Sequence, residues 1–455
     1  MTAPTRDLTD FLHATTLAPL PEATTRSAQY ALLDTLGCAL FGSPEPWSTI
    51  MAEEMLAEGG HGRCTIVGQS QRVPAPAAAL CNGTAAHGFE LDDHLDAAIV
   101  HPGAIVVSAA FASAEAHGAS GERLLLGIIA GYEVLNRIGL AMGVRPAQRG
   151  YHKTAVAGPL GAAVAAGIVM RLPADQLFTA LCLSCATASG TKAFASGAGG
   201  GMEKRMHAGR AAEAGVRMAQ LAARGFSAPP TAVEGKVGLL DVVSGETSQP
   251  ALISHNLGKD WAVDNVYVKT YPCCAWIQAA VQQLVEMRGD RPLQLHDIDK
   301  VRIGVSAYAK AQNGAPAPIE TFGAQFSIPY CCALALMGDP ADPDSYDLDA
   351  IEDPDRRELA RRIEIFVDPE MEAAYPRHYG ARVELELANG KRHAGAVLDP
   401  HGMPADPCTP DELLRKFRKL ASRTKHADAI EAIAQTVQGM RNQRTLDALS
   451  ALLRP

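Results

Sequence analysis

The sequence lacks the features that mark several large protein classes. Basic residues do not dominate: 41 lysines and arginines stand against 50 aspartates and glutamates, and the net charge of −9 argues against nucleic acid or an anionic membrane as the main partner. The N-terminal stretch has no basic start followed by an apolar core, so we expect no signal peptide. The longest apolar run, residues 154–170, is short for a membrane span and contains Pro159. These absences predict a cytoplasmic protein that binds neither nucleic acid nor membrane.

A disulfide framework is also missing. The ten cysteines fall in apolar runs such as TALCLSCATA and YPCCAW, a pattern typical of reduced, buried thiols. Cys182 and Cys185 form a C-x-x-C, but no second pair with metal-ligand spacing accompanies them, so we expect neither a zinc site nor a redox pair there. No Cys–His sequence motif accompanies Cys273 and Cys274, so the two residues are predicted to pack in the interior.

The glycine-rich stretch SGAGGGMEKRMHAG, residues 196–209, lacks both nucleotide-binding signatures. A P-loop requires serine or threonine directly after its lysine, whereas Arg205 follows Lys204. A dinucleotide fingerprint requires a third glycine where Met202 stands. We therefore expect no nucleotide at this loop.

A glycine loop that leads into a helix still offers free N–H groups and the positive end of the helix dipole. Lys204 adds a cation, and His207 lies on the same helical face, whereas Arg205 is expected to point elsewhere. We interpret the stretch as a receptor for a substrate carboxylate, with Gly200 and Gly201 supplying backbone contacts. The alternative is a solvated run of charge after a flexible loop.

Helical periodicity dominates residues 8 to about 260. Segments 22–42, 121–143 and 207–225 carry apolar residues at helical spacing, and each ends at a glycine. Strand-like alternation is almost absent from this half of the chain. We predict an all-α domain over residues 1–261.

The pattern changes after this domain. WAVDNVYVKTYP, DIDKVRIGVSAYA and ARVELELANGKRHAGAVLD alternate like strands, and the last flanks Asn389-Gly390, the dipeptide of a type I′ hairpin. Thr409, with Glu412 three residues on, predicts the capping box of a later helix. We therefore predict a mostly α protein with a smaller α+β domain over residues 262–405, and with helices in residues 406–455 that return to the first domain.

Imidazoles and carboxylates crowd the stretch AAHGFELDDHLDAAIVHPGA. His87, Glu90 and His94 fall at i, i+3 and i+7, on one face of an expected helix. Carboxylates that orient and tune imidazoles suit acid–base catalysis, in which the neighbouring Asp93 and His101 would take part. Two imidazoles and a carboxylate would also suit zinc or iron, and a solvated helix end is the third interpretation.

Three further side chains carry a candidate role. His152 precedes a very apolar helix, whose N-terminal end favours a neutral imidazole. Lys269 follows a strand-like segment and precedes a proline, which predicts a loop position suited to a functional cation. Tyr330 lies near the start of an apolar helix, where it would donate a proton or bind substrate.

Several segments, in their order along the chain, resemble the MmgE/PrpD family over nearly the whole length. They are LLDTLGCALFG, NGTAAHGFELDDH with HPGA, GYHKTAVAGPLGAAVAAG, KRMHAGRAAEAG, VKTYPCC, FSIPYCCALALMGD and ARVELELANGKRHAGAVLDPHG. The resemblance implies a helical domain, a smaller α+β lid, an active site between the two, and a homodimer. It also implies chemistry without a metal or an organic cofactor.

The resemblance also implies the site residues. By motif they are Asp92, Asp93, His101, His152, Lys204 and Lys269, with Tyr330 as a further pocket position. We expect His152 or His101 to move the proton, with Asp93 orienting one of them. The two lysines would bind carboxylates and stabilise the charge of an enolate-like intermediate.

The chain departs from the family pattern at several positions. In the LDFDDT-like segment Glu90 replaces the first aspartate and His94 replaces the threonine, so His94 becomes a candidate for substrate binding. Cys274 and Gln278 stand where relatives carry a histidine, and Cys274 is accordingly a candidate pocket residue.

The chemistry that the resemblance implies is proton removal next to a carboxylate, followed by loss of water, loss of carbon dioxide or reprotonation. We predict a lyase that acts on a small di- or tricarboxylate, with a hydro-lyase of the 2-methylcitrate dehydratase type as the first choice. The alternatives are a decarboxylase of the cis-aconitate type and an epimerase of a dicarboxylate such as iminodisuccinate. More remote are a small-acid binding protein without catalysis and a metal-dependent hydrolase built on His87, Glu90 and His94.

Overall fold

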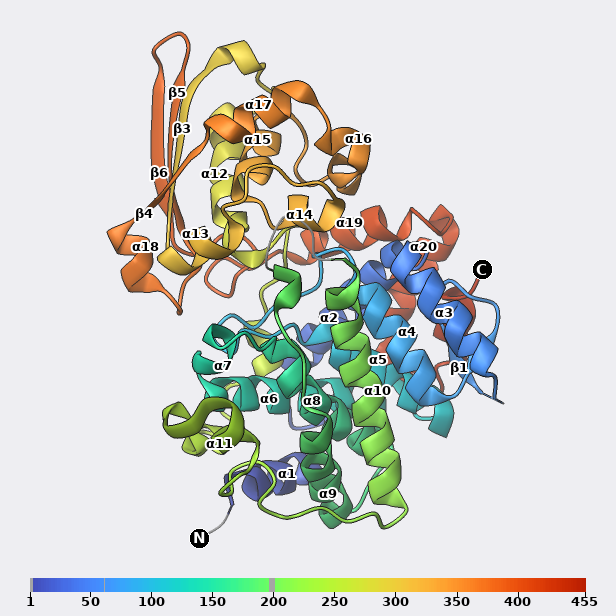
Figure 1. Ribbon diagram of the computed structural model, residues 1–455. Helices are drawn as coiled ribbons and strands as arrows, with labels where there is room; N and C mark the ends of the chain where they lie inside the picture. Colours follow the sequence, from blue (N-terminus) through green and yellow to red (C-terminus); the bar gives the residue numbers. More distant parts are fainter. Residues whose placement is uncertain (1–2, 61, 196–200) are drawn as a thin grey trace.

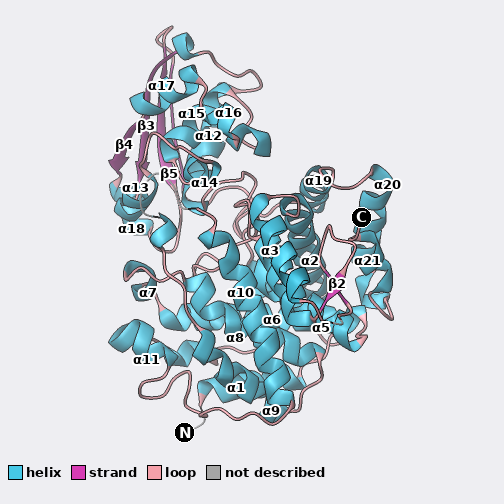
Figure 2. Ribbon diagram, turned by 45° about the vertical axis from the view of Figure 1, so that its right-hand side comes forward, coloured by secondary structure: helices cyan, strands magenta, loops and turns pink. Residues whose placement is uncertain are grey.

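The computed structural model describes residues 3–60, 62–195 and 201–455. Figure 1 shows a large body of helices and, above it, a smaller lobe that contains a four-stranded sheet. In Figure 2 the other strands of the described chain form a short hairpin, β1 (Cys64–Thr65) with β2 (Arg72–Val73). The protein is mostly α with a smaller α+β part, as the sequence predicted.

The helical body is built from the helices that precede residue 245. They are α1 (Pro4–Ala14), α2 (Glu22–Gly42), α3 (Pro46–Glu58), α4 (Ala75–Ala86), α5 (Gly103–His117), α6 (Gly121–Met142), α7 (Arg145–Gln148), α8 (Lys153–Val169), α9 (Ala174–Ser184), α10 (Glu203–Ala223) and α11 (Leu239–Ser244). Helices α2 and α6 coincide with two predicted segments. The hydroxyl of Ser120 caps α6 by accepting from the N–H of Arg123, and Gly143 ends it at a φ of 62°.

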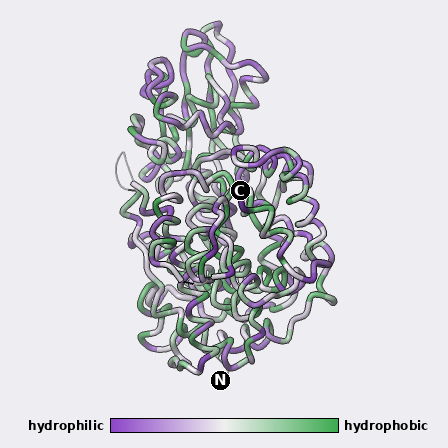
Figure 3. The backbone as a smooth tube through the Cα atoms, turned by 90° about the vertical axis from the view of Figure 1, so that its right-hand side faces the viewer, coloured by the Kyte–Doolittle hydropathy of each residue, from purple (hydrophilic) through white to green (hydrophobic). Residues whose placement is uncertain are grey.

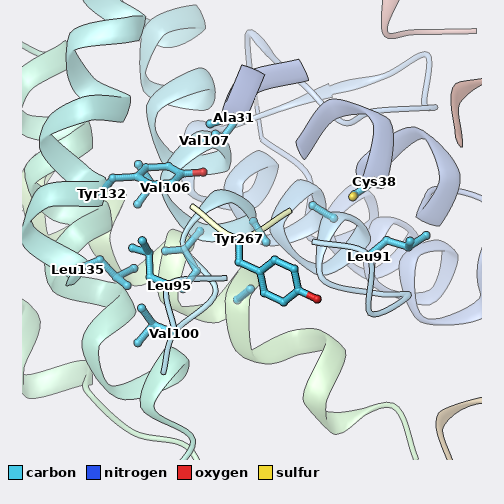
Figure 4. Close-up of a cluster of buried hydrophobic side chains, with 14 of the residues drawn as sticks. Ala31, Cys38, Leu91, Leu95, Val100, Val106, Val107, Tyr132, Leu135 and Tyr267 are labelled. Atoms are coloured by element: carbon cyan, nitrogen blue, oxygen red, sulfur yellow. The ribbon is translucent and has the colours of Figure 1, made fainter. Parts of the chain in front are cut away.

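Helix α8 lies at the centre of this body. Every one of its residues is buried, because its alanines and glycines allow α6 and α10 to pack closely on it. Figure 3 shows hydrophobic segments within the helical body and hydrophilic segments along much of the upper lobe. In Figure 4, Val106 of α5 and Tyr132 and Leu135 of α6 gather with Leu95 and Tyr267 from connecting segments.

Helix α6 is long and apolar enough to cross a membrane by length and composition alone. In this structure 89% of its apolar window is buried inside the protein. It packs against α5 and α8, so burial in the core accounts for its apolar sequence.

Helices α4 and α10 touch through their backbones. A Cβ atom on Gly209 would lie 2.3 Å from the carbonyl oxygen of Leu80, and one on Gly83 would lie 2.8 Å from the Cα of Gly209. Real Cβ atoms do not approach so closely, so the crossing requires glycine at both positions. It fixes the start of α10 beside the segment that follows α4, and both carry functional side chains.

The upper lobe extends from α12 to β6. Its elements are α12 (Gln278–Arg288), β3 (Ile298–Val305), α13 (Ala307–Asn313), α14 (Thr321–Gln325), α15 (Ile328–Met337), α16 (Leu348–Ile351), α17 (Pro354–Arg362), β4 (Glu364–Val367), α18 (Pro369–Ala374), β5 (Ala381–Leu387) and β6 (Arg392–Val397). The strand order is β4-β3-β5-β6, with β3 and β4 parallel and the other pairs antiparallel. Helix α12 covers one face of the sheet (Figure 1), and Gln283 donates to the carbonyl of Ala381 at 2.9 Å.

The β5–β6 hairpin forms where the sequence predicted it, but the predicted turn type is wrong. Gly390 has a φ of 82°, whereas Asn389 does not have the positive φ that a type I′ turn also requires. The Gly390 N–H donates to the carbonyl of Leu387 at 2.8 Å, and the Leu387 N–H donates to the carbonyl of Lys391 at 2.9 Å. These bonds describe a three-residue loop that ends in a left-handed glycine, which matches the twist of the strands equally well.

The strand predicted from WAVDNVYVKTYP is also wrong. Ala262–Asn265 form a 3-10 turn, and Tyr267 makes an isolated bridge to His94 through backbone hydrogen bonds of 2.8 and 2.9 Å. The partner of this segment is a loop of the helical body, so the alternation reflects burial of Tyr267 and Lys269 between other elements.

The last helices are α19 (Pro410–Ala421), α20 (Ala427–Gln438) and α21 (Asp447–Leu452), and α19 and α20 pack on α2 of the helical body. Helix α19 begins with the predicted capping box. The hydroxyl of Thr409 accepts from the N–H of Glu412, whose carboxylate accepts from the N–H of Thr409. The C-terminal chain thus lies beside the N-terminal helices.

Candidate active site

A pocket opens between the helical body and the upper lobe. The helical body contributes His101, His152 and Lys204 to its wall, and the upper lobe contributes Trp276 and Gln312. Pockets at a domain boundary commonly bind small molecules.

The segment after α4 is not the helix expected from the spacing of His87, Glu90 and His94. Helix α4 ends at Ala86, and Glu90 adopts a left-handed φ of 58°. The chain turns here, so the three side chains do not share a helical face. The turn buries Glu90, which is 1% exposed. A strained backbone at a buried charge is typical of functional sites.

Three cations share the carboxylate of Glu90. Lys204 donates to its Oε1, Arg205 Nη1 lies 3.2 Å from the same oxygen, and Lys269 Nζ lies 3.5 Å from Oε2. Burial raises the pKa of Glu90, but the positive charges of these three neighbours outweigh burial and hold the pKa below its ordinary value. With Asp92, whose Oδ1 lies 3.7 Å from Lys269 Nζ, two negative charges stand against three positive ones. The surplus makes this part of the pocket a receptor for anions.

The structure corrects the expectation that Arg205 points away from the site. Its guanidinium is buried, and besides Glu90 it donates to Gln325 Oε1 at 3.0 Å. The exposed arginines of this helix are Arg210 and Arg217, which both pair with Glu213. The turn at Glu90 lies over the start of α10, so two neighbouring faces of the helix meet the same carboxylate.

Asp92 is the carboxylate beside the imidazoles. Its Oδ2 lies 2.6 Å from His87 Nδ1 and 3.3 Å from His101 Nδ1, while Oδ1 lies 3.7 Å from Lys269 Nζ. Burial raises the pKa of Asp92, but His101, His87 and Lys269 together lower it well below its ordinary value. Asp92 is therefore ionised and orients both rings.

Among the described residues, the carboxylate of Asp93 does not contact an imidazole, although its predicted orienting role would require this contact. Its carboxylate accepts from the hydroxyl of Tyr132 at 2.6 Å and from the N–H of Gly103 at 2.8 Å. A Cβ on Gly103 would lie 2.7 Å from this carboxylate, which explains the glycine of the HPGA motif. Burial raises the pKa of Asp93 to about 7. The carboxylate anchors the start of α5, and only the backbone carbonyl of Asp93 contacts an imidazole.

That imidazole is His101, whose Nδ1 donates to the Asp93 carbonyl at 2.9 Å. Because a carbonyl only accepts, the neutral ring carries its proton on Nδ1 and a lone pair on Nε2. Burial lowers the pKa of His101 well below its ordinary value, although Asp92 opposes the shift. The ring is neutral at pH 7, and its Nε2 is a proton acceptor in the pocket wall.

His152 lies at the N-terminal mouth of α8, as the sequence predicted. Its Nδ1 lies 2.8 Å from Nδ1 of His207, so one of the two rings donates to the other. The Nε2 of His207 lies 3.5 Å from the carboxylate of Glu203, which favours a proton on that nitrogen. His152 is then the donor at Nδ1 and keeps a lone pair on Nε2. Burial, followed by repulsion from His207, lowers the pKa of His152 well below its ordinary value.

His94 lines the same pocket beside His101. Its Nδ1 lies 2.6 Å from Asp96 Oδ1, and the two imidazole rings have centroids 4.7 Å apart. The aspartate fixes the tautomer of His94, which leaves its Nε2 as an acceptor. The predicted substrate-binding position of His94 is thus in the pocket wall.

The remaining candidate residues are divided between the pocket and other places. Cys274 is buried and lines the pocket, and burial raises the pKa of its thiol. Tyr330 is outside the described pocket wall, and its hydroxyl donates to the carbonyl of Ser345 at 2.7 Å. Gly201 is exposed and has a φ of 59°. Gly200 lies outside the described residues.

The ten cysteines all fall within the described residues and are free thiols, and eight of them are buried. This confirms the interior packing predicted from their apolar surroundings. Burial raises the pKa of Cys182 and of Cys185 to about 12, so neither thiol of the C-x-x-C ionises at neutral pH.

Three buried donors lie close enough to hold a metal ion. They are His87, Asp92 and His101, whose ligand atoms lie within 4.8 Å of one another. They differ from the set that the sequence spacing suggested, because Glu90 faces the cations. Lys269 Nζ, 3.7 Å from Asp92, opposes a divalent ion at this place, and hydrogen bonds between the donors already explain their geometry.

The sequence analysis misplaced one site residue and missed another. Glu90 was expected on a helical face with His87 and His94, but its contact with three cations depends on a backbone turn that spacing does not reveal. Lys192, in the stretch SGTKAF, has no motif or periodicity around it, and only its place in the pocket wall identifies it.

A helical body, a smaller α+β lobe and an anion-binding pocket of lysines and imidazoles between them define a two-domain enzyme of the MmgE/PrpD type. Residues 6–251 match the MmgE/PrpD N-terminal domain, and residues 271–440 match the MmgE/PrpD C-terminal domain. The chain therefore belongs to the MmgE/PrpD family.

Curated relatives align with almost the full chain. A cis-aconitate decarboxylase-like protein of Aspergillus oryzae is 29% identical, over 95% of this chain and 94% of its own length. Cis-aconitate decarboxylases of Aspergillus terreus and Homo sapiens are 27% and 25% identical, over 95% and 97% of this chain and 92% and 93% of theirs. These relatives are lyases, and the chain is an enzyme of that class.

Proposed function

We propose that this enzyme is a decarboxylase of a small tricarboxylate of the cis-aconitate type. The observation that carries the proposal is the pocket in which Lys204, paired with Glu90 and backed by the buried Lys269, lies beside imidazoles with acceptor nitrogens. The names of the full-length relatives favour loss of carbon dioxide over loss of water.

The residues divide the chemistry into charge binding and proton transfer. The cations hold the carboxylates of the substrate and lower the free energy of the carbanion that forms. When the C–C bond to the departing carboxylate breaks, its electron pair moves through the adjacent C=C bond toward a carboxylate that remains, and carbon dioxide leaves. A proton from the imidazolium of His152 then forms the new C–H bond. Each turnover consumes one proton, which His152 regains from water.

The substrate itself prepares the proton donor. In the empty pocket His152 is neutral because burial lowers its pKa. A bound tricarboxylate adds negative charge beside the ring, and an adjacent negative charge raises the pKa of an imidazole. His207 and Glu203 keep the Nε2 of His152 as the nitrogen that exchanges the proton.

The hydro-lyase and epimerase alternatives use the same pocket with a different outcome. A neutral His152 or His101 would remove a proton next to a carboxylate, and water would leave or the proton would return to the other face. The hydro-lyase of the 2-methylcitrate type, first choice from the sequence, stays a prediction. The alternative of a metal-dependent hydrolase required His87, Glu90 and His94 on one helical face, and the turn at Glu90 removes that face.

The test is to incubate the purified enzyme with cis-aconitate, 2-methylcitrate, iminodisuccinate and related acids in deuterated water and to follow them by NMR. The proposal predicts a decarboxylated product with one deuterium at the protonated carbon. Dehydration or epimerisation would replace the proposal with the matching alternative. A protein that exchanges and converts none of these acids would be a binding protein only.

The role of His152 is tested by His152→Gln. We expect turnover to fall at least about a hundredfold, because general acid–base catalysis contributes roughly 10²- to 10⁴-fold. The control is His296→Gln, a change at a surface imidazole that is 83% exposed. Near wild-type turnover of His152→Gln would transfer the proton-transfer role to His101 or His94.

A further inference from the structure

The backbone places Lys192 beside the proton-transfer residue. Residues 150–152 pair antiparallel with residues 190–192, through one bridge and two flanking hydrogen bonds of 3.0 and 2.7 Å. Side chains alternate between the two faces of paired strands. His152 and Lys192 therefore leave the same face of this pairing, and both line the pocket.

The ammonium group of Lys192 extends across the boundary between the two bodies. It donates to the hydroxyl of Tyr308 and, at 2.8 Å, to Gln312 Oε1, both on α13 of the upper lobe. It lies 5.0 Å from the ring centroid of Tyr308 and 5.7 Å from that of Trp276. These contacts hold the cation on the lobe side of the pocket.

The electrostatic surroundings of Lys192 differ from those of the two lysines beside Glu90. Lys204 and Lys269 have Glu90 as a counter-ion, whereas the described hydrogen-bond partners of Lys192 are a hydroxyl and an amide. Burial, with repulsion from Lys204 added, lowers the pKa of Lys192 to about 8, so the group is mostly protonated at pH 7. A partly buried ammonium with neutral partners gains strongly from a bound carboxylate.

We propose that Lys192 binds a carboxylate of the substrate at the lobe side of the pocket, while Lys204 binds another at the side of Glu90. Lys192 then selects substrates that carry anionic groups at both ends. The inference rests on the proposed function, because it takes a polycarboxylate as the ligand.

The test uses binding of tricarballylate (propane-1,2,3-tricarboxylate), which has no C=C bond to react, measured by isothermal titration calorimetry. Lys192→Met keeps the apolar stem on Trp276 and removes the charge. We expect the dissociation constant to rise about tenfold or more, as for loss of one charge-assisted hydrogen bond. Lys192→Arg, which keeps the charge, should retain most of the affinity. Lys310→Met removes an exposed lysine from α13 and should change nothing.

Lys204→Gln is the positive control and separates the possible failures. If Lys204→Gln weakens binding and Lys192→Met does not, the role of Lys192 is overturned and the proposed function stands. If the wild-type enzyme does not bind tricarballylate, the tricarboxylate proposal fails, and the role of Lys192 fails with it. Thermal unfolding of each variant shows whether a loss of affinity reflects a loss of folded protein. If Lys192→Met is less folded, the affinity of Lys192→Arg decides whether the charge at this position binds the ligand.

Discussion

Glu90 shows how one side chain can organise a charged site. Placed in the interior by a left-handed turn, it holds Lys204 at the wall of the pocket and the buried Lys269 and Arg205 behind it, without neutralising all three charges. Removing one member of a buried charge cluster usually costs more than its net contribution, because the remaining charges lose their compensation.

This arrangement predicts that the enzyme needs Arg205 as well as the neighbouring Lys204. Arg205→Ala should lower kcat/KM at least about tenfold, since a charged group lost beside a buried carboxylate costs roughly 1.5–3 kcal/mol. Lys204→Ala should lower it further, because this lysine also lines the pocket. Arg210→Ala, at an arginine whose side chain is 57% exposed, is the matched control. Unchanged kinetics of Arg205→Ala would show that the guanidinium is only structural.

The pKa of Lys192 predicts how ligand binding depends on pH. The group is protonated below its pKa of about 8 and loses its charge above it, so the affinity for tricarballylate should decrease as the pH rises from about 8 to 9.5. Tyr308, Gln312 and Trp276 face the ammonium without charge, and Lys204 repels it. Calorimetry of Lys192→Met over the same range should give a shallower dependence. If the affinity of the wild-type enzyme and that of Lys192→Met depend equally on pH, a group other than Lys192 titrates in this range.

At the residue scale, the sequence revealed positions whose signal is local. His152 and Lys204 stand at the starts of helices. The apolar or small residues that follow them in the sequence show where these helices begin. Arg205 was assigned to the wrong side because its environment depends on the turn at Glu90. Asp92 and Asp93 are adjacent in the chain, and only the fold decides which carboxylate meets the imidazoles.

At the scale of elements, the crossing of α4 and α10 positions the charge centre. Gly83 and Gly209 let the two backbones touch, which brings the turn after α4 onto the first residues of α10. The distance between Glu90 and Lys204 therefore depends on the helix crossing as well as on side-chain rotamers.

Gly209→Ala tests this dependence. The added methyl would lie 2.3 Å from both the carbonyl of Leu80 and the hydroxyl of Thr84, so the helices must separate. We expect a loss of roughly 1–3 kcal/mol in the free energy of unfolding, together with lower kcat/KM. Thermal melts and kinetics measure both. Arg217→Ala, on the exposed side of the same helix, should change neither, and an unaffected Gly209→Ala would mean that the crossing relaxes without cost.

Elements with their own periodicity and caps were predictable, whereas those that depend on distant partners were not. Helices α2 and α6 follow their apolar spacing, and α19 follows its capping box. The expected strand near Tyr267 failed because its backbone partners are single residues far away in the sequence, His94 for Tyr267 and Gly402 for Val268. The hairpin dipeptide gave the position of the turn but not its type, since glycine suits more than one geometry.

At the scale of the whole molecule, the resemblance to the family implies a homodimer. We propose that the chain, of 47.9 kDa, sediments as a species of about twice that mass. Analytical ultracentrifugation over a range of concentrations measures this directly. A single species of the monomer mass that retains full activity would contradict the proposal, and it would also show that one chain suffices for the pocket.

The helical body and the upper lobe each form one side of the pocket, and this division matters for engineering the substrate preference of the enzyme. The contact between α4 and α10 anchors one end of the ligand by backbone geometry, which tolerates little variation. The other end meets Trp276, Tyr308 and Gln312, side chains of a lobe with its own sheet. New substrate preferences should therefore be easiest to engineer by exchanging residues of the lobe, which leaves the charge centre intact. The charge centre and the residues that contact the other end of the ligand thus belong to different parts of the molecule.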